Sequence, residues 1–404
     1  MVPIVKTRAK ILVATLQPDW VGPARLPSLL RRANVEVHLL APEGPAHASR
    51  FVHSVPARPA DGPEFVRCLR EHLSAHPGEY KLVLPSDDDA FAALAREKDR
   101  SWLTPWFPVD PLGKDFEAIY LKHRFNEFCH RHGLLAPENI ECRNLPEVLV
   151  AAEKLGYPVM LKNHLGAGGS GVRKSTTPAA LASHYAELST ASPYGLSVQE
   201  FIPGQVGSCH VVARRGKVLQ WFSYQTLKTW LHPEGPSVVT STIVAPEVDK
   251  LAFRMAEITG YHGLFGLDWV RSNHDGRIYL LECNPRMTPA ICRAKLFGLD
   301  LADVIEDLWS ETPPAVPPRT IRRQGSERSF PLDALRCIDD GDWRGLWGNA
   351  RDTLLLLNYI PWSEPRLLYP SFRLIAVHFL KNRTGLLPWL KVVRDCFRPA
   401  QACF

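Results

Sequence analysis

Residues 263–288 read GLFGLDWVRSNHDGRIYLLECNPRMT. Two apolar runs, 264–270 and 277–282, flank a group of turn-forming residues, and this pattern predicts a β-hairpin. We expect a three-residue loop over 274–276, with Gly276 in the left-handed conformation that such loops favour. This loop length sets which residues of the two strands face each other.

The expected register brings oxygen-bearing side chains together on one face of the hairpin. Asp268 lies directly opposite Glu282, with Cβ atoms roughly 4.5–5.5 Å apart, and Asn284 shares their face because side chains alternate along a strand. Two carboxylates this close repel unless a cation neutralises them, and Mg²⁺ takes oxygen ligands. Arg286 is suited to gripping a phosphate. The set indicates a Mg²⁺-nucleotide site, and a solvated surface face is the alternative.

The segment Glu282-Cys283-Asn284-Pro285-Arg286 resembles the E-x-N-P-R signature of ATP-grasp enzymes. Asp268 stands where that family carries its first acidic metal ligand, which is often glutamate in biotin-carboxylase-like members. The resemblance implies that Asp268, Glu282 and Asn284 hold Mg²⁺, or Mn²⁺, in a site for two ions. It also implies that Arg286 is catalytic and steadies the phosphoryl group being transferred from ATP.

A glycine-rich loop follows Lys162, which closes the apolar run 157–162. Glycines let backbone N–H groups approach phosphate oxygens, and the lysine supplies a point charge. The segment is not a P-loop, because no Gly-Lys-Ser/Thr opens a helix, and a flexible surface turn is the alternative. In ATP-grasp proteins such a loop is the lid over the triphosphate. By this resemblance, the nucleotide-binding residues are Lys162, Gly166, Gly168, Gly169, Ser170 and Gly171.

Two further segments extend the resemblance. Residues 198–204, VQEFIPG, resemble the linker whose backbone reads the adenine edge, although alone they indicate only a strand ending in a Pro-Gly turn. Lys122, followed by GLLAP at 133–137, resembles the phosphate-binding lysine at the start of the domain; a solvated lysine is the alternative. The residues implied on the adenine side are Gln199, Glu200, Phe201 and Ile202.

The chain departs from the family pattern after Gly204. The family commonly has a carboxylate in the next strand, whereas this chain reads QVGSCH over 205–210. His210 either replaces that acid or has a structural role. Lys228 and the turn 232–237 resemble a basic residue and a turn on the substrate side, and we assign Lys228 a catalytic role on that basis.

Composition bounds the remaining possibilities. The chain has 404 residues, of which 45% are hydrophobic and 22% charged, as in ordinary globular proteins. Nine cysteines without a C-x-x-C pair argue against both a disulfide framework and a zinc site. They fit a reducing cytosol. No apolar run is long enough for a membrane span, and the N-terminal apolar run is too short for a signal peptide. We therefore expect a cytoplasmic protein.

The N-terminal residues alternate between strand-like and helix-like segments. This βαβαβ order predicts an open parallel sheet with helices on both faces, as at the start of typical ATP-grasp proteins. A glycine-rich dinucleotide fingerprint is absent, so NAD binding is not expected. Residues 85–89, PSDDD, predict a helix N-cap, with a substrate contact as the alternative. The expected strands are 10–16, 35–41 and 80–84, and the expected helices are 24–33 and 63–75.

The expected protein is α/β, with an α+β ATP-grasp core. Its domains would be a Rossmann-like domain over 1–112, the ATP-grasp domain over 113–311 with a lid lobe at about 157–200, a proline-rich linker over 312–318, and a basic, mostly helical region over 319–404.

The last region carries the net charge of the chain. It has 14 of the 48 basic residues and 8 of the 42 acidic residues of the chain. The remainder of the chain therefore has 34 basic and 34 acidic residues, so the net charge of +6 lies after residue 318. Basic residues mixed with tryptophans indicate a membrane-surface or protein-binding segment, and a helical domain docked on the core is the alternative. No nucleic-acid motif is present. The tryptophans and apolar clusters are Trp343, Trp347, Trp362, Trp389, 354–357 and 372–380.

The resemblance implies an ATP-dependent ligase that activates a carboxylate as an acyl phosphate for attack by an amine. Its partners would be small-molecule carboxylate and amine substrates. Two alternatives stay open: a bicarbonate-activating enzyme of the carboxylase or carbamoyl-phosphate type, and a non-catalytic ATP sensor acting through the basic region. The identity of the substrates cannot be read from the sequence, because substrate-side loops have no portable signature.

Overall fold

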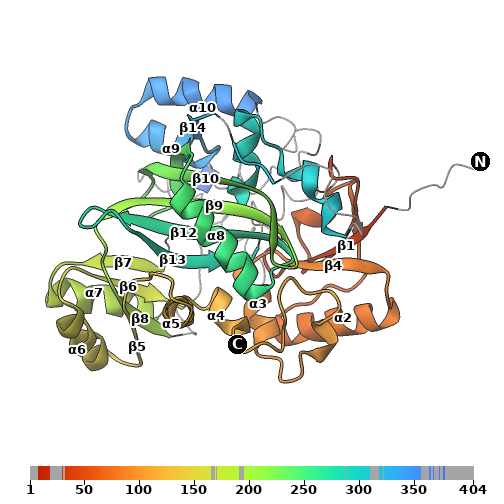
Figure 1. Cartoon of the computed structure of the whole chain (residues 1–404), viewed down its shortest axis with the longest axis horizontal. Coiled ribbons are helices and arrows are strands. Elements are labelled where there is room, and N and C mark those ends of the chain that lie inside the picture. Colours follow the sequence, from red (N-terminus) through yellow and green to blue (C-terminus); the bar gives the residue numbers. More distant parts are fainter. Residues whose placement is uncertain are drawn as a thin grey trace, which may run out of the picture.

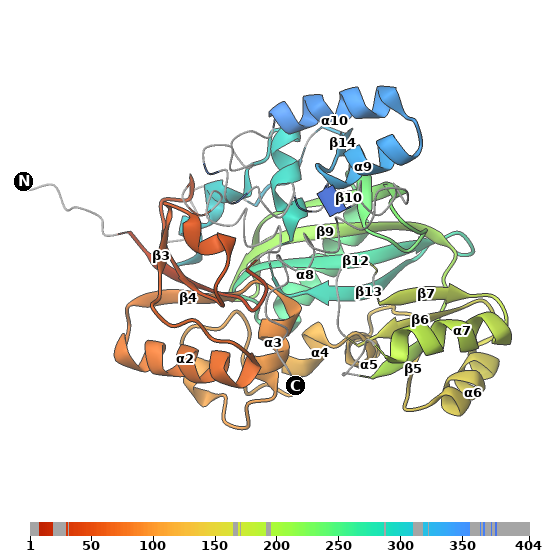
Figure 2. The same cartoon turned by 180° about the vertical axis from the view of Figure 1, so that it is seen from behind.

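Three β-sheets organise the protein, as the cartoon views of the computed structural model show (Figures 1 and 2). Among the helices described, none is long and apolar enough to cross a membrane. The structure describes residues 8–18, 30, 32–164, 169, 171–190, 195–286, 288–309, 318–321, 323–355, 364, 367, 373 and 376–377.

The N-terminal sheet is parallel and has the order β3-β2-β1-β4. The expected strands over 10–16, 35–41 and 80–84 are confirmed, and β3 is an additional short strand. The expected helix over 63–75 is also confirmed, while most of the one over 24–33 lies outside the described residues. The bounds are β1 Lys10–Ala14, β2 Glu36–Leu40, β3 Val52–Ser54, α2 Gly62–Ala75, β4 Tyr80–Pro85 and α3 Asp88–Ala95.

A second, antiparallel sheet forms a separate lobe with the order β5-β8-β6-β7. Helices α6 and α7 cover one face of this sheet (Figure 1). Val148 and Ala152 of α6 and Leu181 of α7 are buried in one cluster with Leu161 and Val198 of the strands. The bounds are β5 Asn139–Cys142, α6 Leu145–Leu155, β6 Val159–Asn163, β7 Val172–Ser175, α7 Pro178–Ser189 and β8 Leu196–Glu200.

The third sheet is antiparallel, with the order β13-β12-β9-β10-β11-β14. Helix α8 lies across it (Figure 2), and Ala252 and Met255 of this helix are buried in the same core as Val211 of β9 and Trp269 of β12. The bounds are β9 Gly204–Arg214, β10 Lys217–Thr229, β11 Ser237–Ile243, α8 Pro246–Thr259, β12 Gly263–Ser272, β13 Ile278–Asn284 and β14 Gly325–Arg328.

Short helices connect these sheets. Helix α5 packs against both β13 of the third sheet and β5 of the second, so it joins the two lobes. The bounds are α4 Phe116–Tyr120, α5 Lys122–Arg131 and the 3₁₀ helices η1 Pro45–Ala48, η2 Ser101–Leu103, η3 Pro289–Phe297, η4 Leu301–Val304 and η5 Glu306–Leu308.

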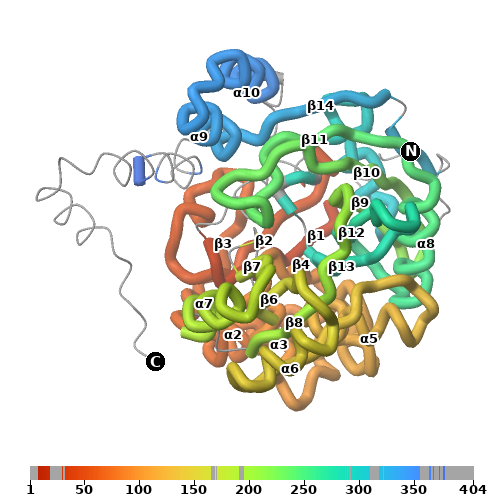
Figure 3. Tube along the Cα trace, turned by 90° about the vertical axis from the view of Figure 1, so that its left-hand side faces the viewer, coloured from red at the N-terminus to blue at the C-terminus, as the bar shows by residue number. Residues whose placement is uncertain are grey.

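The C-terminal region is anchored to the rest of the molecule. Strand β14 pairs with β11, and α9 (Leu332–Asp339) and α10 (Trp343–Leu355) follow it beside the third sheet (Figure 3). A buried ion pair joins Arg293 of η3 to Glu327 of β14, with Nε and Oε1 2.7 Å apart. Glu364 accepts hydrogen bonds from the Ser49 hydroxyl and the Arg50 backbone N–H. Trp362, Trp389 and most of 354–357 and 372–380 lie outside the described residues.

Candidate active site

The hairpin of β12 and β13 has the register that the sequence predicts at its acidic end. Asp268 pairs directly with Glu282, and Gly276 has a φ of 71°. The three-residue loop over 274–276 is wrong, however. The Ser272 N–H donates to the Arg277 carbonyl at 2.9 Å, so these two residues form the last pair of the hairpin. Four residues, 273–276, therefore connect them.

A bulge reconciles the longer loop with the predicted pairing. Trp269 pairs with Leu280, whereas the next pair along the hairpin is Asp268 with Glu282. Leu281 is therefore the extra residue that opposes no residue of its own on β12. The bulge compensates for the longer loop and leaves Asp268 opposite Glu282.

The paired carboxylates lie in a half-buried polar cluster. The Asn284 amide donates to Asp268 at 3.2 Å and to Glu282 at 3.4 Å, and the Ser208 side chain also hydrogen-bonds Asp268. Burial and the neighbouring Glu282 charge raise the pKa of Asp268. Burial would also raise the pKa of Glu282, but the ammonium groups of two nearby lysines outweigh it and lower that pKa. Half-buried paired carboxylates beside an amide oxygen fit a divalent cation.

Three cationic side chains lie around this cluster. Nζ of Lys122, at the start of α5, is 3.0 Å from Oε2 of Glu282. Lys162, on β6, is 7% exposed, and burial lowers its pKa to about 8 even though Glu282 favours its charged form. Arg286 is buried just after β13. The structure thus brings these three residues to the acids, and the phosphate contacts assigned to them from the sequence stay predictions.

Arg286 binds a carboxylate of the N-terminal domain. Its Nε and Nη2 donate to the two oxygens of Asp88 at 2.6 and 3.2 Å. Asp87 is the N-cap of α3 and accepts from the Ala90 N–H at 2.8 Å, as the capping prediction requires. The sequence did not assign the ion pair to Asp88, although acids beyond the carboxyl end of a parallel strand are positioned to meet a ligand or a neighbouring domain.

The glycine-rich loop contacts the turn between β10 and β11. A Cβ atom on Gly169 would lie 1.9 Å from the Glu234 carbonyl oxygen, and the φ of Gly169 is +72°. Gly171 lies close to Asn163, and a Cβ atom on Gly171 would lie 2.9 Å from the Asn163 side chain. The other predicted loop residues, Gly166, Gly168 and Ser170, lie outside the described residues.

The predicted adenine-side residues lie on and just after β8. The Gln199 side chain is buried, and its Nε2 donates to Oδ1 of Asn126 at 3.3 Å. This hydrogen bond fixes the orientation of the amide, so Oε1 of Gln199 is the atom that can accept a hydrogen bond from a ligand. The backbone N–H of Glu200 donates to the Glu138 carbonyl at 2.8 Å. Phe201 and Ile202 follow the strand, and Lys174 lies over the Phe201 ring with Nζ 3.7 Å from its centroid. No sequence pattern marks Lys174.

His210 and Lys228 lie in different surroundings. His210 is 2% exposed, its ring stacks on Phe222 and Tyr224, and burial lowers its pKa to about 3. This environment fits the structural role for His210. Lys228 is half exposed on β10, with Nζ 3.8 Å from Oδ2 of Asp342 in the C-terminal region.

The arrangement can be compared with known proteins. Two lobes meet at a hairpin that carries paired carboxylates and an asparagine and is followed by an arginine. Helix α5 and strand β6 each contribute one lysine to this cluster. A family model of the ATP-grasp domain matches residues 122–290. The chain therefore contains an ATP-grasp domain, and the resemblance drawn from the sequence is confirmed.

Curated relatives share part of this region. Acetyl-CoA carboxylase of Schizosaccharomyces pombe is 27% identical over 152 residues, which are 36% of this chain and 7% of that protein. The carbamoyl phosphate synthase large chain of Thermotoga neapolitana is 25% identical over 209 residues, 48% of this chain and 19% of that one. The chain thus spans only a small part of these relatives.

Solved structures share the fold over most of the chain. N5-carboxyaminoimidazole synthetase from Staphylococcus aureus, complexed with ADP, superposes with a TM-score of 0.63 at 12% identity and covers 83% of this chain and 87% of that one. The biotin carboxylase domain of Hydrogenobacter thermophilus 2-oxoglutarate carboxylase gives 0.60 at 15% identity, with 79% and 74% covered.

Proposed function

We propose that this protein is an ATP-dependent ligase that activates a carboxylate for attack by an amine. One observation carries the proposal: Asp268, Glu282 and Asn284 form a half-buried cluster that also holds the cationic groups of Lys122 and Lys162. A Mg²⁺-bound triphosphate needs both oxygen ligands for the metal and cations for the phosphates.

The chemistry proceeds in two steps. A substrate carboxylate oxygen attacks the γ-phosphorus of ATP, the bond to the β-phosphate oxygen breaks, and ADP leaves. The amine nitrogen then attacks the acyl phosphate carbon, phosphate leaves, and the nitrogen loses a proton. Mg²⁺ held by Asp268, Glu282 and Asn284 would supply charge neutralisation.

The residues of the chain position and neutralise the reactants, and positioning and charge stabilisation account for most of phosphoryl-transfer catalysis. Lys122 and Lys162 bind phosphate oxygens, Arg286 steadies the transferred group, and the glycine-rich loop covers the phosphates. Lys228 contributes on the substrate side. The adenine-side contacts are made by Gln199, Glu200, Phe201 and Ile202.

The test is ADP release in the presence of Mg²⁺, with amino acids and small carboxylates screened singly and in pairs. Glu282→Gln removes one carboxylate charge and is expected to abolish release while leaving the folded state intact. Glu71→Gln, on the exposed surface of α2, is the matched control and should behave as the wild type. Equal turnover by Glu282→Gln would overturn the metal assignment.

Bicarbonate is the second candidate for the activated acid. The Hydrogenobacter thermophilus structure contains bicarbonate with MgADP, and an Aspergillus clavatus synthase structure contains ADP and an aminoimidazole ribonucleotide. ADP release that requires bicarbonate, and that no other carboxylate supports, would select this reaction. ATP binding without any turnover would instead favour a nucleotide sensor.

We propose that the protein is cytoplasmic and that its C-terminal region binds an anionic membrane surface or a protein partner. Trp343 and Trp347 stand one turn apart on α10 and are 72% and 79% exposed, which is unusual for such large apolar side chains. Co-sedimentation with anionic vesicles, and its loss in Trp343→Ser/Trp347→Ser, would support the membrane. Unchanged sedimentation of the variant would contradict it.

A further inference from the structure

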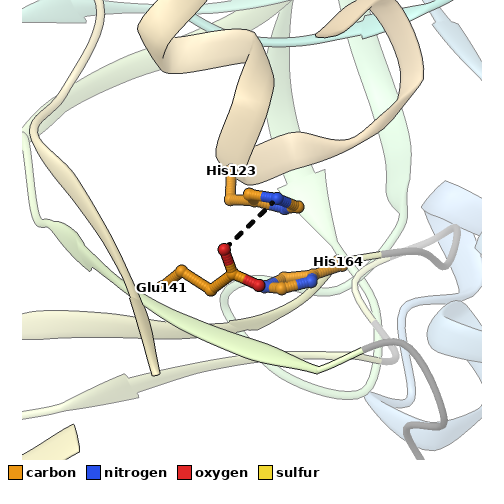
Figure 4. Close-up of side chains that lie close together, drawn as sticks. All are labelled: His123, Glu141 and His164. Atoms are coloured by element: carbon orange, nitrogen blue, oxygen red, sulfur yellow. Dashed lines mark ion pairs between the residues drawn. The ribbon is translucent and has the colours of Figure 1, made fainter. Parts of the chain in front are cut away.

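Two histidines and a glutamate converge beside the nucleotide lobe. His123 comes from α5, Glu141 from β5, and His164 directly follows β6 (Figure 4). One ligand atom from each residue lies within 4.8 Å of those of the other two. Nε2 of His123 is 3.7 Å from Oε2 of Glu141, and the two imidazole centroids are 3.9 Å apart.

The surroundings keep the His123 imidazole neutral and leave one of its nitrogens without a hydrogen-bond partner among the described residues. His123 is 8% exposed and His164 2% exposed. Burial and the adjacent His164 lower the pKa of His123 to about 3, so its ring is uncharged at neutral pH and carries a lone pair. Within the described part of the chain, Nδ1 of His123 is buried without a hydrogen-bond partner. A buried polar atom without a partner needs an explanation.

The spacing suits a small ion. Imidazole nitrogens and carboxylate oxygens bind Zn²⁺ at roughly 2.0–2.2 Å, so two atoms on one ion are separated by about 3.3 Å in a tetrahedral site and by at most about 4.3 Å. The 3.7 Å between His123 and Glu141 lies inside this range. The 4.8 Å bound on the whole cluster is wider than this range, and the two rings are tilted by 32° with respect to each other, so binding of the ion requires a side-chain rotation that brings the nitrogen lone pairs together.

We propose that His123, Glu141 and His164 bind a late divalent transition-metal ion, of which Zn²⁺ is the representative. Two imidazoles with one carboxylate form a ligand set that selects such ions over Mg²⁺. The cysteine pattern predicted no zinc site, and this site uses histidines instead. It is separate from the acidic cluster of Asp268 and Glu282.

The ion would cross-link three elements next to the nucleotide site. Lys122 directly precedes His123, and Lys162 lies two residues before His164. The Lys122 backbone N–H also donates to the His164 carbonyl at 3.4 Å. The bound ion therefore fixes α5, β5 and β6, and with them the backbone positions of both lysines.

The experiment uses the full chain, freed of metal with a chelator and titrated with Zn²⁺ in the presence of excess Mg²⁺ and ADP, so that Mg²⁺ and nucleotide compete with Zn²⁺ for the acidic cluster. Equilibrium dialysis should show about one tight Zn²⁺ per chain. Glu141→Gln should weaken that binding at least about 10-fold, since its side chain is half exposed and its loss leaves the fold intact. Glu153→Gln, on the exposed surface of α6, is the matched control and should bind as the wild type.

Two further readouts distinguish the site from adventitious binding. Co²⁺ in place of Zn²⁺ should give the intense visible absorption of a tetrahedral site, and the absorption should be lost in Glu141→Gln and in His123→Asn. Zn²⁺ should raise Tm in the wild type and not in Glu141→Gln. No stoichiometric binding, or equal affinity in Glu141→Gln, would overturn the proposal. These readouts need no turnover, so they are independent of the ligase activity.

Discussion

Gly169 and Gly276 show how one backbone conformation has different roles at two sites. Their φ values are +72° and +71°, which cost a non-glycine residue roughly 1–2 kcal/mol. A Cβ on Gly276 would meet nothing within 4 Å, whereas one on Gly169 would collide with the Glu234 carbonyl oxygen. Replacing either glycine thus has the same conformational cost, but only a replacement of Gly169 also causes a collision.

We predict that Gly169→Ala separates the loop from the β10–β11 turn and raises KM for ATP about 10-fold or more. Gly276→Ala is the control, because it has the same backbone cost and no collision. It should lower the free energy of unfolding by about 1 kcal/mol and leave KM unchanged. Steady-state kinetics and urea unfolding measure both quantities. Equal KM values for the two variants would contradict a role of the loop in nucleotide binding.

Asp88 and Asp89 are neighbours in the first turn of α3 with different partners. Asp88 binds the buried Arg286, while Asp89 accepts a hydrogen bond from the exposed Gln17 side chain. We predict that Asp88→Asn lowers the free energy of unfolding by about 3 kcal/mol, because it removes the carboxylate that pairs with a buried guanidinium.

Asp89→Asn should lower the free energy of unfolding by less than about 1 kcal/mol. The two substitutions change the helix N-terminus in the same way, so the difference between them measures the Arg286 ion pair. Urea unfolding of both variants is the measurement, and equal destabilisation would show that the ion pair contributes nothing.

His262 gives a pH dependence of stability. Burial lowers its pKa from 6.5 to about 4, helped by Arg215 and Arg214. The unfolded state therefore binds a proton more readily than the folded state, and stability is lost as the pH falls from 6.5 towards 4. The slope from this group is at most about 1.4 kcal/mol per pH unit. In His262→Asn, unfolding measured over this range should show a smaller slope, and an unchanged slope would contradict the assignment.

At the scale of elements, the hairpin shows how far the sequence determines the site. Alternation and the turn residues predict the pairing of Asp268 with Glu282, and this pairing is confirmed. The loop differs from the predicted one. A four-residue connection and the Leu281 bulge together produce the register that a three-residue loop without a bulge would give. A bulge depends on packing of both strand faces, so local sequence patterns do not reveal it.

The rest of the fold also contains elements that the sequence predicts and elements that it does not. The strands and helix around the parallel sheet carry regular apolar runs, and they were predicted to within a few residues. Strand β3 has three residues at the sheet edge, too few for a period-two pattern. The partners Asp88 and Ser208 were missed, because nothing in the local sequence of either residue marks a contact with a segment far along the chain. His123 and His164 were missed for the same reason.

At the scale of the whole molecule, the C-terminal region completes the third sheet. Strand β14 covers the edge of β11, and Glu327 of β14 is the buried partner of Arg293. We predict that truncation after residue 318 exposes this edge, leaves the Arg293 charge without that partner, and lowers Tm by more than about 10 °C or causes aggregation. Thermal unfolding and size-exclusion chromatography measure this result.

Truncation after residue 355 is the control for this experiment. It keeps β14, α9 and α10, and we expect a much smaller fall in Tm. If the chain ending at residue 318 were monomeric and as stable as the control, the region beyond 318 would be an accessory domain rather than a part of the sheet.

The ion pairs around the hairpin have a consequence for the order of binding. Three acids, Asp88, Asp268 and Glu282, lie among three cations, Lys122, Lys162 and Arg286. The cluster is therefore close to electroneutral, and neither a free metal ion nor a free triphosphate meets a net opposite charge. A cation that takes Glu282 releases Lys122 for a phosphate, and a phosphate that takes Lys122 releases Glu282 for a cation. We expect metal and nucleotide to bind synergistically, each increasing the affinity for the other by the same factor.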